Sequence, residues 1–491
     1  MLIKKDRAAI ESYLEDSSNI KGGYAEGVAF PENIGELSEL LAKANREHTP
    51  VTASGGGTAT TGARIPFGGI AVSLEKLNNV IDVSAESNVA RVEAGATVED
   101  LKRACDKKGL FYACHPTEKW AFVGGTVATN ASGARSFKYG PTRRYVKRLK
   151  MVLADGQILD INRGEYKLTK KSPDLLLNGG RRISIPLPAY RMPDVKNSAG
   201  YFAKDGMDAI DLFIGQEGTL AIIAEAEFTL TKMPSRILSS FVFFKSAPDS
   251  WSFASDARRL SRQGRGIDAL SIEYLGRNAL ELLRLKSGNV PAAARAAIFF
   301  EQEMPEKDDA RTMNAWLKLI KEHNASADET WVAMTESEEE EFNRLRHSIP
   351  ESVNEMVKAN GFSKLSTDIA VPEKNFTKIM DFYRDSLNRE DMRHVIFGHI
   401  GECHLHVNLL PKNEGQLERA QRICMEFYKK GVALGGTVSA EHGIGKIRRK
   451  YLEVMYGRQG ILEMARIKKA LDANCILGLD NIFQREILRS V

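Results

Sequence analysis

Cysteine is scarce in this chain of 491 residues, and the five that occur are scattered without a C-x-x-C pair. This spacing gives no sign of a zinc ribbon or of an iron–sulfur cluster on the chain itself, and an odd, scattered set of thiols suits a reducing compartment. No stretch approaches the roughly 20 apolar residues of a membrane span, and the N-terminus lacks an apolar run of signal-peptide length. We therefore expect a cytoplasmic protein, with peripheral binding to the inner face of a membrane left open.

A strong excess of charge is missing as well. The 69 basic and 64 acidic residues leave a formal net charge of +5, and no basic run is interleaved with aromatic residues. The sequence thus gives no reason to expect nucleic acid as a partner. Hydrophobic residues make up 43% and charged residues 27% of the chain, which is ordinary for a folded protein. Because a chain of this length exceeds what one hydrophobic core usually organises, two or three domains are expected.

The first part of the chain reads as a mixture of helices and strands joined by glycine-rich turns. Residues 33–49 form an amphipathic helical pattern that Asn33 would cap, because apolar residues recur along it every three or four positions. A second helix is predicted at 97–109, and short strands at 50–53, 70–74, 78–83 and 90–95. This pattern indicates an α+β region that extends to about residue 231.

The pattern of predicted helices and strands changes near residue 232. Strands are predicted at 241–246, 296–303, 394–400 and 404–410, and helices at 249–263, 308–323 and 415–435. Strands that alternate with helices predict a second sheet, and we expect the helices of this sheet to lie on one of its faces.

Three glycine-rich segments occur in the first part: VTASGGGT (51–58), HPTEKWAFVGGTVATNASGARSFKYGPTRRYV (115–146) and DLFIGQEGTLAII (211–223). The stretch GGGTATTG is not a dinucleotide-binding fingerprint, because that motif needs a following helix and an acidic residue about 20 positions later. One glycine cluster alone would favour a simple turn. Three clusters in this order carry more information than any one of them.

On these segments the chain resembles flavoproteins of the vanillyl-alcohol oxidase/p-cresol methylhydroxylase (PCMH) superfamily, and within it the branch of the D-lactate and D-2-hydroxyglutarate dehydrogenases. The resemblance runs from about residue 31 to residue 482. It implies an α+β fold with a PCMH-type FAD-binding domain of two subdomains at 31–231. It also implies a substrate-binding cap domain with a largely antiparallel sheet at 232–435, and a C-terminal segment, 436–491, that returns to the FAD domain and completes the active site. Residues 1–30 are expected to form an N-terminal helical segment.

The resemblance implies non-covalent FAD, because the first glycine loop has no histidine to which the flavin could be attached. This loop matches a segment whose backbone N–H groups hold the pyrophosphate, where converging donors are needed and side chains would obstruct. Ser54 stands where relatives often have arginine. The residues expected to contact FAD are Ser54, Gly55, Gly56, Gly57, Thr58, Pro116, Thr117, Gly124, Gly125, Thr129, Asn130, Gly133, Tyr139, Glu217, Gly218, Ile223 and Asn481.

Four of the nine histidines lie in two short segments, GHIGECHLH and SAEHGIG. His404 and His406 are two positions apart, so on a strand they would share a face, and His399 on a partner strand can approach that face. A lone histidine on a strand is more often structural than a ligand. Three histidines in eight residues, followed by Glu441 and His442, favour a metal site for Zn²⁺, Mn²⁺, Fe²⁺ or Co²⁺.

The resemblance implies a role for each member of this cluster. His399, His406 and Glu441 match the metal ligands, and His442 matches the catalytic base. His404 stands where relatives usually have asparagine, so it is open whether it contacts substrate, supports a ligand or is itself a ligand.

Four further residues match substrate contacts by the resemblance: Arg346, Asn408, Lys196 and Tyr201. Arg346 suits a carboxylate because the guanidinium fork binds it bidentately, and we favour this role over the alternative of a helix-surface charge beside an acidic run. Lys196 and Tyr201 could equally be structural. Ser366, where some relatives have lysine, weakens D-2-hydroxyglutarate as the substrate.

These matches predict an FAD-dependent dehydrogenase that oxidises a small D-2-hydroxy acid, such as D-lactate or D-2-hydroxyglutarate, to the 2-keto acid. A divalent metal would polarise the hydroxyl, His442 would take its proton, and hydride would move to flavin N5. The electrons would then pass to a quinone, a cytochrome or an electron-transfer flavoprotein, and a homodimer is left open.

Three other functions compete with this one. The first is a non-redox FAD enzyme like the alkyl-dihydroxyacetonephosphate synthases, but these carry a contiguous histidine triplet that the chain lacks. The second is a glycolate-oxidase-like subunit of a larger complex. The third is a subunit that binds flavin only structurally, against which the intact pair Glu441 and His442 argues.

Overall fold

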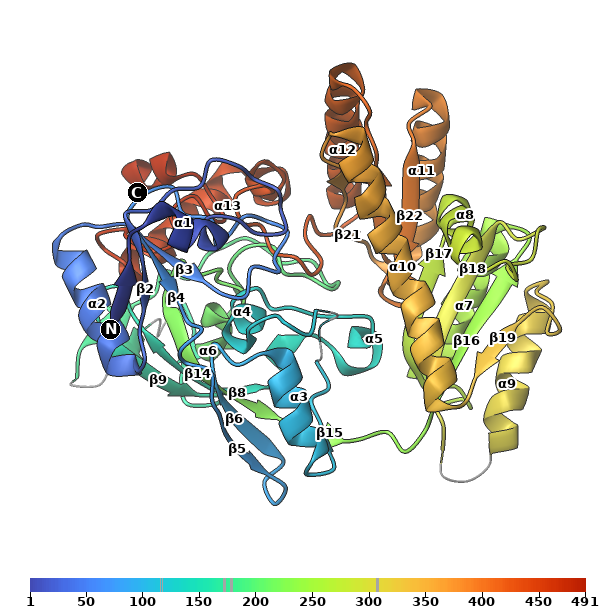
Figure 1. The fold of residues 1–491 in the computed structure, drawn as a ribbon, viewed down its shortest axis with the longest axis horizontal. Helices are drawn as coiled ribbons and strands as arrows, with labels where there is room; N and C mark the ends of the chain where they lie inside the picture. Colours follow the sequence, from blue (N-terminus) through green and yellow to red (C-terminus); the bar gives the residue numbers. More distant parts are fainter. Residues whose placement is uncertain (115, 117, 171–173, 177–179, 306–308) are drawn as a thin grey trace.

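The computed structural model describes residues 1–114, 116, 118–170, 174–176, 180–305 and 309–491. Thr117, one of the predicted FAD contacts, lies outside these residues. The chain folds into two lobes that lie side by side (Figure 1). The first lobe combines the residues up to about 232 with the C-terminal segment, and the second lobe holds the residues in between. None of the described helices is long and apolar enough to cross a membrane.

The first lobe contains a four-stranded sheet with the order β1-β2-β4-β3. Its strands are β1 (Leu2–Lys4), β2 (Gly27–Phe30), β3 (Val51–Ser54) and β4 (Ile70–Ser73). Helix α2 (Ile34–Arg46) follows β2, and its cap is the predicted one, since the Asn33 side chain accepts from the Glu36 amide. Residues 1–30 are not the helical segment that we expected: they hold only the short helix α1 (Arg7–Ile10) and a 3-10 turn. The apolar segments at either end pair instead as antiparallel strands β1 and β2, which buries β2 completely.

A second, antiparallel sheet of the same lobe has the order β5-β6-β14-β8-β9. Its strands are β5 (Val80–Ser84), β6 (Val89–Glu93), β8 (Val146–Val152), β9 (Ile158–Asn162) and β14 (Ile222–Thr229). Helix α3 (Val98–Asp106) begins at the reciprocal capping pair Thr97 and Asp100. Smaller elements are α4 (Val123–Ala128), α5 (Ser136–Tyr139), α6 (Ile210–Phe213), and the pairs β7 (Leu110–Phe111) with β15 (Thr231–Lys232), β10 (Lys167–Leu168) with β13 (Met207–Asp208), and β11 (Asp174–Leu176) with β12 (Arg182–Ser184).

The second lobe is built on an antiparallel sheet with the order β19-β16-β18-β17-β22-β23-β20, and β21 pairs with β23. Its strands are β16 (Ile237–Phe244), β17 (Ala269–Leu275), β18 (Ala296–Glu303), β19 (Trp331–Ala333), β20 (Leu365–Ser366), β21 (Ile369–Ala370), β22 (His394–Gly398) and β23 (His404–Leu409). The predicted antiparallel cap sheet is therefore confirmed.

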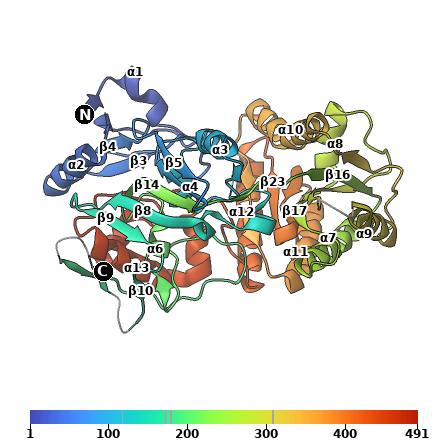
Figure 2. The same ribbon diagram turned by 90° about the horizontal axis from the view of Figure 1, so that it is seen from below.

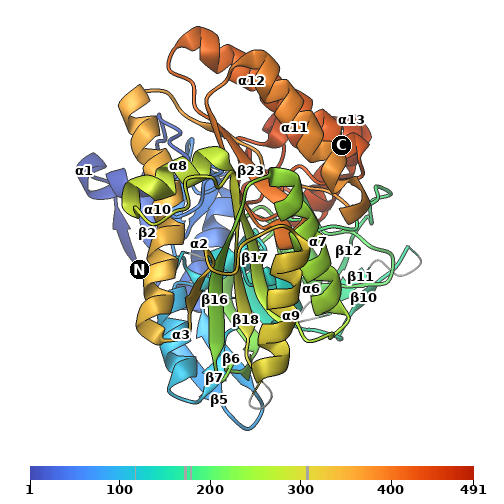
Figure 3. The same ribbon diagram turned by 90° about the vertical axis from the view of Figure 1, so that its right-hand side faces the viewer.

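Helices cover both faces of this sheet, which corrects the expectation of a single covered face (Figure 3). Helices α7 (Ala247–Arg262) and α9 (Asp309–Glu322) pack on one face, and α8 (Arg277–Lys286) and α10 (Glu336–Asn360) pack on the other. The physical reason lies in the central strands: every residue of β17 is buried, and a strand buried on both sides needs cover on both sides. Helices α11 (Phe376–Glu390) and α12 (Glu414–Ala433) extend the lobe.

The C-terminal segment returns to the first lobe, as predicted. Helix α13 (Arg449–Leu471) lies within that lobe (Figure 2). The chain that follows pairs with β3, because Val51 donates to the Ile476 carbonyl at 2.7 Å and accepts from the Gly478 amide at 2.8 Å. The segment between residue 436 and α13, which contains Glu441 and His442, is thereby held where the two lobes meet.

Candidate active site

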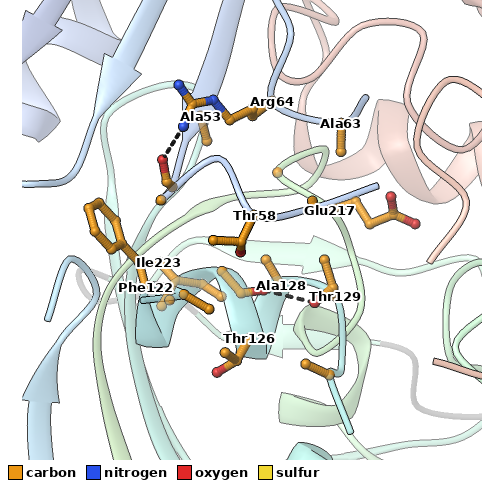
Figure 4. Close-up of a pocket in the computed structure, with 18 of the residues that line it drawn as sticks. Ala53, Thr58, Ala63, Arg64, Phe122, Thr126, Ala128, Thr129, Glu217 and Ile223 are labelled. Carbon is orange, nitrogen blue, oxygen red and sulfur yellow. Dashed lines mark hydrogen bonds between the residues drawn. The ribbon is translucent and has the colours of Figure 1, made fainter. Parts of the chain in front are cut away.

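A cavity lies between the two sheets of the first lobe, beside α4 (Figure 4). Strand β3 leads into its glycine loop, α4 supplies a second stretch of wall, and β14 a third. Most of the predicted FAD contacts line it: Ser54, Gly55, Gly56, Gly57, Thr58, Pro116, Gly124, Gly125, Thr129, Glu217, Gly218 and Ile223. Segments that are far apart in sequence thus form one wall.

The wall has the features that a ligand with several acceptor groups requires. Gly57 has φ +78°, and a Cβ there would stand only 2.4 Å from the Arg64 guanidinium, so this position needs glycine. At Gly125 a Cβ would meet nothing within 4 Å, so the backbone there faces open space. Ser54 is fully buried, and its hydroxyl has no hydrogen-bond partner among the residues that the structure describes. Buried polar atoms are rarely left without partners, so Ser54 is poised to bind a group that enters the cavity.

Arg64 is a cavity residue that the sequence analysis missed. Its guanidinium donates to the Gly55 carbonyl at 2.8 Å and to the Ser12 carbonyl at 2.5 Å (Figure 4). It therefore fixes the glycine loop and brings a positive charge to a wall where Ser54 stands in place of the arginine frequent in relatives. The sequence shows only that a basic residue follows the glycine loop closely. Its spacing does not predict that the Arg64 side chain folds back onto that loop.

Four predicted FAD contacts, Asn130, Gly133, Tyr139 and Asn481, are not among the described residues that line this cavity. The Asn130 side chain accepts from the Arg143 amide at 3.0 Å, and Asn481 donates to the Ala63 and Glu217 carbonyls at 2.9 and 3.0 Å. Gly133 accepts from the Ser136 hydroxyl, and the Tyr139 ring packs on Phe111.

Glu217 joins the cavity wall to the SAEHGIG loop. Its buried carboxylate accepts from the amides of Ile444 and Gly445 at 2.8 and 2.7 Å, which anchors the residues just after His442. Burial raises the pKa of this carboxyl from 4.5 to about 7, although the two amide donors lower it. Glu217 is therefore a titrating group that holds the loop, rather than only a neighbour of the cofactor cavity.

This pKa predicts a stability change with pH. Glu217 binds its proton more tightly in the folded chain than in the unfolded chain, so its contribution is present below pH 4.5 and is lost as the pH rises through about 7. At one pKa unit per 1.36 kcal/mol, the loss is on the order of 3 kcal/mol. Glu217→Gln should remove this part of the pH dependence of the melting temperature, whereas Glu86→Gln on an exposed turn should leave the wild-type slope. Identical slopes in all three proteins would contradict the assignment.

The predicted metal ligands meet around one carboxylate oxygen. Glu441 Oε1 lies 3.2 Å from His399 Nε2 and 3.2 Å from His406 Nε2. Two atoms that bind one metal at about 2.1 Å, at tetrahedral or octahedral angles, are about 3.0–3.4 Å apart. The spacing therefore fits a shared divalent cation.

The far side of each of these imidazoles is also held. His399 Nδ1 lies 2.7 Å from Glu273 Oε1, and His406 Nδ1 lies 3.0 Å from the Thr367 carbonyl. Such partners behind a metal-binding histidine orient its ring. Burial alone would lower the pKa of His399, but the carboxylates of Glu273 and Glu441 raise it to about 10, so a cation bound here would take the place of that proton.

Lys196 lies inside this cluster and is buried. Its ammonium group is 2.8 Å from Glu441 Oε2, 2.9 Å from Glu402 Oε2 and 3.0 Å from the Ser136 hydroxyl. Burial would lower the pKa of Lys196, but the two carboxylates raise it above its ordinary value. Lys196 thus joins the two lobes and turns the other oxygen of Glu441, Oε1, toward the histidines.

His442 lines the cavity and has a carboxylate behind it. Its Nδ1 lies 3.1 Å from Asp368 Oδ2, and its Nε2 lies 3.6 Å from Glu441 Oε1. Asp368 also accepts from the Ser439 hydroxyl at 2.7 Å and from Arg448 at 3.1 Å. Burial would raise the pKa of Asp368, but His442 and Arg448 hold it well below its ordinary value.

Neither Asp368 nor Glu273 was among the site residues predicted from the sequence. Asp368 was visible only as the aspartate of TDIAVP, and Glu273 as one residue of a buried strand. Their roles become apparent only once β17 and β21 are placed beside the histidine strands.

The predicted substrate contacts fall in different places. Arg346, on α10, has a buried Nε without a partner among the described residues, and its Nη1 lies 3.7 Å from Glu273. Asn408 donates within the sheet to the Val395 carbonyl at 3.2 Å. Tyr201 is fully buried, and its hydroxyl bonds to Thr219 at 2.7 Å in the core of the first lobe. The structure therefore brings Arg346 to the cluster, but not Tyr201.

Comparisons with known proteins agree with this architecture. Residues 25–162 match an FAD binding domain, and residues 236–479 match the C-terminal domain of FAD linked oxidases. The chain is 27% identical to glycolate oxidase subunit GlcD of Bacillus subtilis, with 95% of this chain and 90% of that protein covered. It is 28% identical to a D-lactate dehydrogenase of Archaeoglobus fulgidus (93% and 91% covered) and 26% identical to a D-2-hydroxyglutarate dehydrogenase of Xanthomonas citri (98% and 94% covered).

Solved structures share the fold. A 4-ethylphenol oxidase from Gulosibacter chungangensis superposes with a TM-score of 0.70 at 15% identity, covering 99% of this chain and 95% of that one. An alkyldihydroxyacetonephosphate synthase superposes with a TM-score of 0.66, also at 15% identity, covering 97% and 82%. At this identity the likeness concerns the fold alone. With both domain matches in order along the chain and together covering most of it, the protein belongs to the FAD-linked oxidases and is an FAD-dependent oxidoreductase.

Proposed function

We propose that the protein oxidises a small D-2-hydroxy acid to the 2-keto acid. The observation that carries this proposal is that Glu441 and His442 belong both to the histidine cluster and to the wall of the cavity lined by the glycine loops. A hydroxy acid held at the cluster would therefore face the flavin. Relatives named D-lactate dehydrogenase and D-2-hydroxyglutarate dehydrogenase, similar over more than nine tenths of this chain, support an acid of this class.

We propose His399, His406 and Glu441 as the ligands of a divalent metal, on the grounds of their spacing and of the partners behind both rings. FAD is proposed to bind without a covalent bond in the cavity, against Ser54 and the glycine loop. When bound, FAD supplies the acceptor for hydride, and the metal supplies a charge that lowers the pKa of the substrate hydroxyl.

His442 is the proposed base. Because its Nδ1 faces Asp368, its Nε2 is the nitrogen that faces Glu441, and Nε2 is the atom that would take the hydroxyl proton. The buried carboxylate of Asp368 holds the ring in this orientation and stabilises the positive charge that the ring gains. The same arrangement of carboxylate, imidazole and substrate hydroxyl serves general-base catalysis in other enzymes.

Arg346 is the proposed partner of the substrate carboxylate. Its Nε is buried without a partner among the described residues, and its contact with Glu273 at 3.7 Å is loose. A guanidinium binds a carboxylate through two parallel hydrogen bonds, and Nε with Nη2 would supply them here once Nη2 leaves its 3.3 Å contact with His347 Nε2. Lys196 is proposed to orient Glu441, to which its ammonium group donates. Asn408 is proposed to support β23 by donating to the Val395 carbonyl of the neighbouring strand.

The electrons must leave the reduced flavin for a second acceptor. A quinone, a cytochrome or an electron-transfer flavoprotein would serve, and a relative named D-lactate dehydrogenase [cytochrome] from Saccharomyces cerevisiae supports the second of these. The relative named glycolate oxidase subunit GlcD supports a variant of the proposal in which this chain acts as the flavin-carrying subunit of a larger complex.

The experiment that tests the function is an anaerobic substrate panel. The yellow holoenzyme should be bleached by D-lactate or D-2-hydroxyglutarate, because two electrons per molecule enter the flavin, while the matching L-acids should leave it oxidised. Flavin absorbance measured over time identifies the acid. A broad panel of D-2-hydroxy acids, glycolate included, that leaves the flavin oxidised would refute the proposal.

A further inference from the structure

We propose that His404 is a third imidazole ligand, which coordinates through Nδ1, so that this site holds its metal with three histidines and one glutamate. The proposal rests on the proposed function in so far as the metal site does. His404 is completely buried, and neither of its nitrogens has an aligned hydrogen-bond partner among the described residues. An unsatisfied buried polar group destabilises the fold, and a bound cation would offset this cost.

The position of the ring indicates which nitrogen is free to coordinate. His404 Nε2 lies 2.9 Å from Asp368 Oδ1, so Nδ1 is turned to the opposite side, where it lies 3.9 Å from Glu441 Oε2. The candidate ligand atoms of His399, His404, His406 and Glu441 all lie within 4.8 Å of one another. Ligands on opposite sides of one metal are about 4.2 Å apart and adjacent ones about 3 Å. Four donor atoms this close together can converge on one cation after small shifts of their side chains.

Each of the three imidazoles has an oxygen behind its other nitrogen. Glu273 stands behind His399, the Thr367 carbonyl behind His406, and Asp368 behind His404. This arrangement is the usual one for metal-binding histidines.

A purely structural role, in which His404 serves only to hold Asp368, leaves the Nδ1 side of its ring unexplained. Asp368 already accepts from the Ser439 hydroxyl at 2.7 Å, from the His442 amide at 3.1 Å and from Arg448 at 3.1 Å. Removing His404 would leave these three donors in place. All three of these donors reach Oδ2 of Asp368, and its Oδ1 has His404 Nε2 beside it at 2.9 Å. Contact with Asp368 therefore accounts for Nε2 of His404, whereas Nδ1, which has no aligned partner among the described residues, faces the cluster.

A third imidazole changes which metal the site prefers. Nitrogen donors suit Zn²⁺, Fe²⁺ and Co²⁺, whereas Mn²⁺ and Mg²⁺ suit oxygen-rich sites. We therefore expect Zn²⁺, Fe²⁺ or Co²⁺ in this protein, with Mn²⁺ bound more weakly.

Two substitutions of His404 separate coordination from contact with Asp368. Glutamine places an amide nitrogen near the position of Nε2 and keeps the contact with Asp368, but has no atom at Nδ1. Asparagine places an amide atom near Nδ1 and loses the contact. The holoenzymes of wild type, His404→Gln, His404→Asn and the control His394→Gln are stripped with a chelator, titrated with Zn²⁺ against a competing chromogenic chelator, and studied by X-ray absorption at the zinc edge. FAD absorbance and the melting temperature check the fold of each.

Wild type and His394→Gln should show three imidazoles on zinc, and His404→Gln two. The affinity of His404→Gln for Zn²⁺ should fall by more than the roughly 100-fold that loss of an outer partner costs, and His404→Asn should retain more of it. Two imidazoles in the wild type, or unchanged affinity in His404→Gln, would overturn the role of His404 and leave the proposed function standing. A wild type that binds no zinc would overturn both this proposal and the metal site on which it rests, while the substrate panel still decides the reaction.

Discussion

His442→Ala should retain FAD and lose reduction of the flavin by the hydroxy acid. The ring lines the cavity at its border with the histidine cluster, and the proposed role of its Nε2 is to take the hydroxyl proton. Loss of a general base costs roughly 10²- to 10⁴-fold in rate. Anaerobic stopped-flow measurement of flavin reduction should show this loss, with the flavin absorbance of the purified variant unchanged.

The matched control is His394→Ala, since His394 lies at the opposite end of β22 from the cluster and its ring nitrogen Nδ1 lies 2.8 Å from the Met392 carbonyl. This variant should reduce its flavin at the wild-type rate. Asp368 keeps its contacts with Ser439 and Arg448 in His442→Ala, so the loop should stay folded. Normal flavin reduction in His442→Ala would rule out its role as the base.

Removal of the divalent metal should slow flavin reduction by about 100-fold or more, because polarisation of the hydroxyl is worth several kcal/mol. The protein should survive this treatment. Lys196 pairs with Glu441 at 2.8 Å and with Glu402 at 2.9 Å, so the carboxylates keep a buried positive partner when the metal is gone. The metal content before and after chelation, measured by mass spectrometry, is compared with the reduction rate.

Adding back Zn²⁺ or Fe²⁺ should restore the rate, and Mg²⁺, which prefers oxygen ligands, should not. This pair of additions distinguishes the site from general effects of divalent ions. Full activity in a sample shown to be free of metal would exclude the metal from the reaction, and the cluster would then need another explanation, in which Lys196 supplies the positive charge.

The cavity wall could be predicted from the sequence because its requirements are local. A backbone that approaches a ligand closely needs glycine at that position, so the runs at Gly55–Gly57 and Gly124–Gly125 can be recognised without knowledge of their neighbours. Asn130 and Tyr139 belong to the second glycine-rich segment but are not among the described residues that line the cavity, and they contact Arg143 and Phe111 instead. Whether a side chain faces the cavity or the core depends on packing, which a motif does not contain.

The helical segment expected at residues 1–30 shows what local sequence does not predict. The apolar pattern there is short and is compatible with either a helix or a strand. These residues form strands because β1 pairs with β2, and β2 also pairs in parallel with β4. Pairing partners that arrive from elsewhere in the chain decide such segments. Similarly, only the tertiary fold shows that helices cover both faces of the second sheet.

The sequence by itself determined the α+β class, the glycine-rich wall and the residue types of the histidine cluster, because period-two spacing on strands and the need for bare backbone are properties of short segments. Only the tertiary structure decided what stands behind each of those residues. Asp368, Glu273 and Lys196 come from three separate parts of the chain. Their effect depends on distances of about 3 Å between buried charged groups, because Coulomb and hydrogen-bond energies weaken as this separation increases. Spacing along a chain does not encode separations in space of that kind, so the orientation of His442 and the free nitrogen of His404 became visible only when the two lobes were brought together.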